Sequence, residues 1–220
     1  MSDEHFTVDG TLIQAWASQK SFHSKDGSDD DGGSFHGQKR SNQTHASTTD
    51  GDARLYKKSY GKESKLSYLG HVLVENRNGL IADAMVTTAD GTAERDAALL
   101  MLRQKQQHRS RRITVGADKA YDSEDFVRTV RELNVTPHVT KNDNRRASNL
   151  DRRTTRHAGY AISLRERYEV GANWDVEGRQ ASVSRKQRDD ARENFKTTSP
   201  TELSRRLQPQ PNLPASSRGV

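Results

Sequence analysis

The chain has 220 residues, of which 30% are hydrophobic, 6% aromatic and 30% charged, and its formal net charge is +6. Because an average globular domain is roughly 45–50% apolar, we expect one domain with polar segments that stay outside its core. The sequence contains no cysteine, which excludes disulfides and thiolate metal sites and fits a cytoplasmic protein. No apolar run is long enough for a membrane span, and no secretory signal is visible.

The first half of the chain predicts strands around a polar insert. Residues 6–17, FTVDGTLIQAWA, indicate a buried strand that Asp9 and Gly10 interrupt as a break or bulge. Residues 18–54 contain almost no aliphatic side chain, so we expect a polar insert that is a loop or is disordered. Residues 65–88 predict two antiparallel strands joined by a hairpin turn at Asn78 and Gly79.

The second half alternates helices with strands. Residues 92–108 predict a helix with Glu94 and Asp96 in its early turns, and residues 123–133 predict a second helix with Ser123 as its N-cap. The segments 111–117 and 135–140 predict short strands, with a basic loop over 141–156 and a third helix opening near residue 159. This order favours an α/β fold of the ribonuclease-H-like kind, a mixed sheet with flanking helices.

Two aspartates occupy positions suited to metal chemistry. Asp9 lies inside the first strand, and Asp118 directly follows the strand that ends at Ala117. Carboxylates at strand ends of an α/β sheet can share divalent cations, and Mg²⁺ needs only two or three of them together with substrate phosphate. The alternative stays open that Asp9-Gly10 is a plain turn and that Asp118 only caps the next turn. No histidine spacing typical of a zinc site is present.

Four sequence blocks resemble one family of enzymes. VDGTLIQAWAS, GKESKLSYLGHVLVENRNGL, GADKAYD and RRTTRHAGYAIS closely resemble bacterial insertion-sequence-five-type DDE transposases, over about residues 6–167. The resemblance implies a ribonuclease-H-like catalytic core that uses Mg²⁺ or Mn²⁺, with Asp9 and Asp118 as its first two acids. It also implies a structural or substrate-positioning role for Tyr121, and a cap role for Asp122.

The resemblance ends where the third acid is expected. The family's glutamate follows an S-x-R-x-R segment, here residues 163–167, but the register places it near Gly171, where no glutamate stands. Glu169 is the nearest substitute and Glu166 the next. We therefore expect a catalytic core over residues 1–168 and a disordered basic tail over 169–220, with a frameshift near codon 168. The few residues before Asp9 indicate that the copy is truncated at its front.

Basic side chains predict the DNA partner. The resemblance implies double-stranded DNA, comprising element ends and target, as substrate, and a homo-oligomer as the working form. Arginines of the 141–156 segment can follow a phosphate backbone, although a solvated loop is the plainer interpretation. The candidate contacts are Arg145, Arg146, Arg152, Arg153, Arg156 and His157. The expected function is metal-dependent DNA cleavage and strand transfer, inactive in this copy; the alternatives are a non-catalytic DNA-binding remnant and a pseudogene product.

Overall fold

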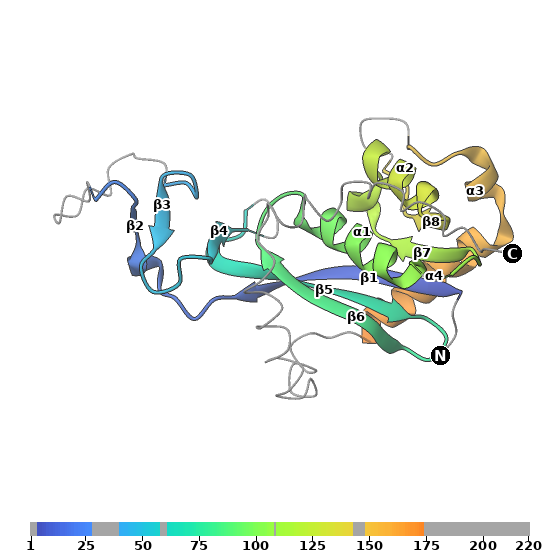
Figure 1. Ribbon diagram of the computed structural model, residues 1–220, viewed down its shortest axis with the longest axis horizontal. Helices are drawn as coiled ribbons and strands as arrows, with labels where there is room; N and C mark the ends of the chain where they lie inside the picture. Colours follow the sequence, from blue (N-terminus) through green and yellow to red (C-terminus); the bar gives the residue numbers. More distant parts are fainter. Residues whose placement is uncertain (1–3, 28–39, 58–60, 108, 143–147, 174–220) are drawn as a thin grey trace, which may run out of the picture.

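A mixed β-sheet forms the centre of the computed structural model, which describes residues 4–27, 40–57, 61–107, 109–142 and 148–173, with side chains to residue 165 (Figure 1). The middle strand β1 pairs antiparallel with β5 and parallel with β7, and β7 pairs parallel with β8. The strands β4 and β6 pair with successive parts of the other side of β5. Their bounds are β1 His5–Gln14, β4 Arg54–Tyr56, β5 Lys65–Glu75, β6 Leu80–Thr88, β7 Ile113–Ala117 and β8 Val135–Val139.

Helices cover both faces of this sheet. On one face lie α1 (Ala93–Gln106) and α2 (Glu124–Glu132), and α4 (Ala158–Asn173) crosses the other (Figure 1). The assignment of faces follows from side-chain contacts, because Phe6 of β1 lies under Lys105 of α1, whereas His138 of β8 bonds to Ser163 of α4. The predicted ribonuclease-H-like architecture, a mixed sheet with flanking helices, is confirmed.

The main core lies between the sheet and the α1–α2 layer. Phe6, Val115 and Phe126 are at most 1% exposed there, and the buried residues of α1 pack onto the same cluster. Apolar side chains at alternate strand positions and at helical spacing meet in this layer, as the sequence pattern predicts. Burial of the apolar surface between the sheet and these two helices supplies the main stabilisation of the fold.

The first strand departs from the prediction at Asp9 and Gly10. The register of β1 against β5 is continuous from Phe6 to Gln14, so the predicted break is wrong. The irregularity instead lies between β5 and β6, where the register shifts between Leu73 and Val74. Glycine inside a strand does not require a bulge; here Gly10 makes room for a side chain of α1.

Part of the polar insert folds, contrary to the prediction that none of it packs. The short strands β2 (Phe22–Ser24) and β3 (His45–Ser47) pair antiparallel after the 3-10 turn η1 (Gln19–Ser21). Phe22 is 3% exposed and packs in a small cluster with Ala15, Ala53 and Leu66. The buried Phe22 side chain thus anchors this segment, although the average composition of the segment is too polar to predict a packed structure.

Further differences concern helix ends. Residues 152–156 of the predicted basic loop form a short helix, α3 (Arg152–Arg156), because the Asp151 carboxylate accepts the Thr154 N–H at 2.7 Å. Ser123 occupies the N-cap position of α2 as predicted, but its side chain makes no capping bond. The helix α4 runs to Asn173, past the predicted boundary at residue 168, since extending a formed helix costs less than starting one. The remaining predicted tail lies outside the described residues.

Among the described residues, no helix is both long and apolar enough to cross a bilayer.

Candidate active site

The parallel pairing of β1 with β7 brings Asp9 and Asp118 to the same edge of the sheet. The last paired positions of these parallel strands are Thr7 and Gly116, and Asp9 and Asp118 each follow two residues later. Because side chains alternate between the faces of a strand, both aspartates project from the same face as Thr7. His138 pairs with Gly116 and shares this face, which is the one that α4 covers. The two predicted acids therefore lie on the same face at the same edge of the sheet, Asp9 within β1 and Asp118 directly after β7.

Backbone N–H groups hold one oxygen of each carboxylate. The Asp118 Oδ1 accepts the Ala120 N–H at 2.7 Å, which makes Asp118 the N-cap of the 3-10 turn η2 (Lys119–Tyr121). The Asp9 Oδ1 accepts the Gly10 N–H at 2.9 Å. The cap role that sequence left as an alternative for Asp118 is thus real. The cap role does not exclude metal binding by Asp118, since a carboxylate has lone pairs for more than one partner.

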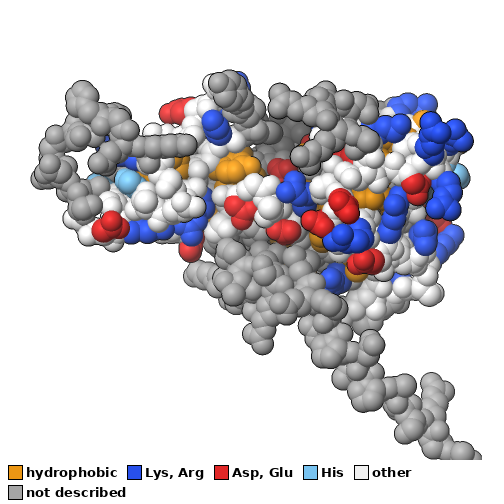
Figure 2. Space-filling view, turned by 90° about the horizontal axis from the view of Figure 1, so that it is seen from above, with side chains coloured by type: hydrophobic (Ala, Val, Ile, Leu, Met, Phe, Trp, Pro, Cys, Tyr) orange, Lys and Arg blue, Asp and Glu red, His pale blue; other side chains and the backbone are white. Residues whose placement is uncertain are grey.

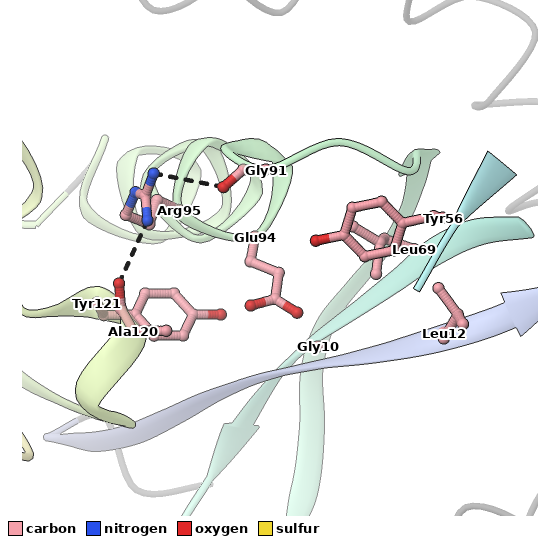
Figure 3. A pocket seen from close by; sticks show the side chains of 9 residues that line it. All are labelled: Gly10, Leu12, Tyr56, Leu69, Gly91, Glu94, Arg95, Ala120 and Tyr121. Carbon is pink, nitrogen blue, oxygen red and sulfur yellow. Dashed lines mark hydrogen bonds between the residues drawn. The ribbon is translucent and has the colours of Figure 1, made fainter. Parts of the chain in front are cut away.

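A pocket of about 230 Å³ lies on the opposite, α1-covered face of β1 (Figure 3). Its walls include Leu12, Tyr56, Leu69 and Tyr121, with Glu94 at its centre. The Glu94 carboxylate lies directly above Gly10, because a Cβ added at Gly10 would be 2.7 Å from Glu94 Oε1. Only glycine permits this approach.

The two tyrosines point toward this glutamate. Figure 3 shows the phenol groups of Tyr56 and Tyr121 directed at the Glu94 carboxylate from opposite sides. Burial, and then the negative charges of Glu94 and Asp90, raise the pKa of Tyr56, while Arg95 acts in the opposite sense. The Tyr56 hydroxyl therefore stays protonated at neutral pH, so it remains a hydrogen-bond donor beside the carboxylate.

The pocket and the aspartate pair share one supporting turn. Arg95 of α1 donates to the Ala120 carbonyl at 3.3 Å, and the N–H of the same residue holds Asp118. The sequence pattern predicts for Glu94 only a favourable place at the start of a helix, and it predicts no role for Arg95. No spacing in the chain reveals them, because α1 meets η2 only in the tertiary structure.

Asp122 is the C-cap residue of η2, a cap as the resemblance implied, and its side chain in addition anchors residues that follow β8. Its carboxylate accepts the N–H groups of Asn142 and Asn149, both at 2.9 Å, and the Asn149 side chain. Burial alone would raise the pKa of Asp122, but these hydrogen bonds and that of Ser148 outweigh it and hold the pKa below its ordinary value. Asp122 thus ties Asn142 and Asn149 to the turn that carries Asp118.

The predicted DNA contacts that are described lie at one end of the molecule. Arg152, Arg153 and Arg156 are exposed on α3, and His157 follows them as its C-cap. Figure 2 shows Lys and Arg side chains gathered at the end where α2 and α3 lie. The ion pair of Arg131 with Asp151, at 3.2 Å, fixes the start of α3 beside the last turn of α2.

This basic end is separate from the aspartate pair. Arg131 lies in the last turn of α2, just before β8 begins, so α3 starts near the edge of the sheet where β8 enters. Asp118 follows β7 at the opposite edge. His157 approaches His138 instead, and its Nδ1 accepts the Gly159 N–H at 3.1 Å, in keeping with a structural role. Arg145 and Arg146 lie outside the described residues.

The donor chemistry fits a divalent cation in part. Two carboxylates side by side suit Mg²⁺, which commonly takes one or two carboxylates and completes its shell with water and phosphate. In the part of the chain that the structure describes, no group of three or more candidate metal ligands occurs. The side chains of Glu166 and Glu169 lie outside that part, although their backbone is in α4.

Comparison with known proteins identifies the family. The family model described as "Transposase DDE domain" matches residues 1–208. No curated protein and no solved structure gives a match to this chain. Because the match covers most of the chain, the chain belongs to the DDE transposase domain family.

Proposed function

We propose that the chain performs the metal-dependent DNA cleavage and strand transfer by which an insertion sequence moves, with Asp9 and Asp118 as catalytic metal ligands. The family makes the protein a transposase, whose substrate is DNA. The finer proposal is supported by the parallel register of β1 and β7, which brings Asp9 of β1 and Asp118, the first residue after β7, to the same edge of the sheet. The insertion-sequence-five type rests on the sequence blocks alone.

The reaction consists of two phosphoryl transfers. Water attacks a phosphodiester at the element end, the P–O bond to the 3′ oxygen breaks, and a 3′-hydroxyl is released. That hydroxyl then attacks a target phosphodiester, and a 3′-hydroxyl of the target strand leaves. Mg²⁺ or Mn²⁺, when bound, lowers the cost of deprotonating the nucleophile and neutralises the developing charge on the leaving oxygen.

The residues of the chain orient this chemistry. The Ala120 N–H and the Arg95 guanidinium fix the turn around Asp118, so the position of its carboxylate does not depend on substrate. Exposed arginines on α3 supply salt-dependent attraction for the DNA backbone. Glu169 of α4 is the proposed third acid, with Glu166 as the substitute, since α4 lies on the face of the two aspartates. A homo-oligomeric working form stays a prediction, and the inactivity expected of this copy from its missing glutamate is the alternative that the metal-binding and nicking measurements decide.

Metal binding tests the proposal directly. Asp118→Ala and Asp9→Ala should each abolish Mn²⁺ binding measured by titration calorimetry on the full chain, together with Mn²⁺-dependent nicking of supercoiled plasmid. Asp125→Asn, an equal change of charge on the exposed side of α2, is the matched control and should leave both unchanged. Circular dichroism checks that each variant is folded.

The remnant hypothesis predicts a different result. A chain that binds plasmid but neither binds Mn²⁺ nor nicks DNA would be a non-catalytic DNA-binding remnant. Metal binding that persists in both alanine variants would remove Asp9 and Asp118 from the metal site. Glu169→Gln, which should reduce nicking while keeping the fold, separates Glu169 from Glu166 as the third acid.

A further inference from the structure

We propose that Asp122 is a positioning residue for Asp118, whose carboxylate it holds in place for metal binding by fastening the turn η2 to the residues that follow β8. This inference rests on the proposed function, because it takes Asp118 as a metal ligand. Asp122 itself contacts neither metal nor DNA, and it acts through the backbone of η2.

The sheet alone does not fix Asp118. Among the described residues, the ladder of β7 with β1 ends at Gly116, and its ladder with β8 ends at Ala117, whose carbonyl accepts the Thr140 N–H at 3.0 Å. Asp118 is the next residue, and its carboxylate bonds to the Ala120 N–H of the turn that follows. The position of this carboxylate therefore depends on the position of η2.

The turn η2 is too short to keep its own geometry. It consists of three residues, Lys119–Tyr121, and hydrogen bonds of 3-10 type have poorer geometry than those of an α-helix. Contacts from outside must hold it. Arg95 reaches the Ala120 carbonyl at 3.3 Å, and the Tyr121 ring packs edge-on against Phe126 at a ring separation of 5.2 Å. Both contacts tie the turn to helices, α1 and α2.

Asp122 ties the end of the turn to the chain beyond β8. Its N–H donates to the Lys119 carbonyl at 3.2 Å, which closes η2. One carboxylate oxygen accepts the Asn142 N–H and the other the Asn149 N–H, both at 2.9 Å. The Asn149 side chain also donates to the Asp122 carbonyl at 3.1 Å. Because Asp122 is 9% exposed, water competes little for these groups.

The carboxylate is the only side chain of this size that can satisfy both N–H groups. Each of its oxygens is an acceptor, whereas the amide of asparagine has one acceptor and one donor. Asp122→Asn therefore sets an N–H against an N–H at one of the two contacts. Metal ligands must keep their distances to within about 0.2 Å, so even a small movement of η2 should weaken metal binding at Asp118.

Asp122→Asn in the full chain tests the inference. The Mn²⁺ dissociation constant, measured by titration calorimetry, should rise about ten-fold, the effect typical of residues that hold a metal ligand in place. At a Mn²⁺ concentration near the wild-type dissociation constant, kcat for plasmid nicking should fall several-fold. The KM for plasmid should stay unchanged, because Asp151 and Arg131 fix the start of the arginine-rich α3 independently.

A measurement without metal reports on the turn itself. In EDTA, the Ala120 amide proton, which bonds to Asp118 Oδ1, should exchange with heavy water faster in Asp122→Asn than in the wild-type chain, as NMR can follow. This readout requires no activity.

Glu75→Gln is the matched control. The buried Glu75 carboxylate also accepts two backbone N–H groups and an asparagine amide, but it does so in the turn between β5 and β6. Glu75→Gln should lower the free energy of unfolding, and it should leave the Mn²⁺ dissociation constant and the exchange of the Ala120 amide unchanged. Loss of a buried anchor is thereby separated from loss of the position of Asp118.

A milder variant keeps the inference testable if Asp122→Asn does not fold. Asn149→Ala removes the amide that bonds to Asp122 and leaves the carboxylate and the Asn142 contact in place. Since Asn149 is exposed, this variant should fold, and its Mn²⁺ dissociation constant should rise roughly three-fold, as expected for one lost neutral hydrogen bond.

The outcomes separate this inference from the proposed function. If Asp118→Ala abolishes Mn²⁺ binding but the folded Asp122 and Asn149 variants bind Mn²⁺ as tightly as the wild-type chain, the proposed function stands and the positioning role is overturned. The positioning role is also overturned if Glu75→Gln weakens Mn²⁺ binding equally. A wild-type chain that binds no Mn²⁺ overturns both.

Discussion

Single residues in this protein owe their chemistry to their neighbours. Asp118 is at once a cap for η2 and half of the aspartate pair, and Asp122, four residues on, is a buried anchor for the loop after β8. Both aspartates follow β7, and the sequence pattern by itself does not distinguish their roles. Their roles differ because the Asp122 carboxylate accepts hydrogen bonds from Asn142, Ser148 and Asn149, which follow β8, whereas Asp118 bonds to its own turn.

Two buried histidines make folding stability depend on pH. Burial lowers the pKa of His71 and of His138 to about 4 each. His71 bonds to Thr87 Oγ1 at 2.8 Å, and His138 to Ser163 Oγ at 2.7 Å. The His71 side chain is 2% exposed and therefore packs in the interior of the molecule.

The direction of the pH effect follows from proton linkage. Both histidines bind a proton more readily in the unfolded chain, where the pKa is about 6.5, than in the folded one. The free energy of unfolding should therefore be highest above pH 6.5 and should fall as the pH drops toward 4. Urea unfolding between pH 7.5 and 4.5 measures this dependence.

Variants identify the histidines responsible. His138→Gln should flatten the pH dependence, and so should His71→Gln, while His23→Gln on the exposed side of β2 should leave it unchanged. A free energy of unfolding that stays constant from pH 6.5 to 4.5 would contradict the effect of burial on both groups.

At the scale of elements, the β5–β6 hairpin shows how local sequence and tertiary packing cooperate. The predicted turn forms, but only Gly79 takes a positive φ, +65°, and Asn78 does not. The buried carboxylate of Glu75 accepts the N–H groups of Arg77 and Asn78 and the Asn78 amide. The hydrogen bonds of the Glu75 carboxylate therefore stabilise the turn, and a pair of residues in the left-handed conformation is not required.

Substitution of Gly79 tests this turn. Gly79→Ala should lower the free energy of unfolding by roughly 1 kcal/mol, because alanine resists a positive φ although the space around it is open. Gly91→Ala is the matched control, since it also faces open space but has no positive φ. Equal stability of the two variants in urea unfolding would show that the positive φ costs nothing.

For the whole molecule, the division at residue 168 is the prediction still to be tested. Ser163 and Leu164 of α4 contact the folded body, whereas the sequence beyond residue 170 has few apolar residues to pack. Limited proteolysis followed by mass spectrometry should trim the chain to near residue 168. A resistant fragment that keeps the final 50 or so residues would contradict both the tail and the frameshift hypothesis.

The sequence by itself determined the alternation of elements and the identity of the strand-end acids. Apolar residues at periods of 2 and 3.6 place β5, β6, α1, β7, α2 and β8 nearly residue for residue, because each element must bury one face. Asp9 and Asp118 are found from their positions in these patterns and from the DGTL and DKAYD blocks. Composition, in contrast, misled on the insert, where the one buried ring of Phe22 organises a hairpin.

Only the tertiary structure decided which side chains meet. The parallel register of β1 and β7 brings to one edge of the sheet two aspartates that are more than a hundred residues apart in sequence. The packing of α1 over Gly10 brings Glu94 and Arg95 to the same turn, and the Asp122 bonds close a loop over it. Contacts of this kind depend on long-range register and on the approach of backbones, which local periodicity does not encode.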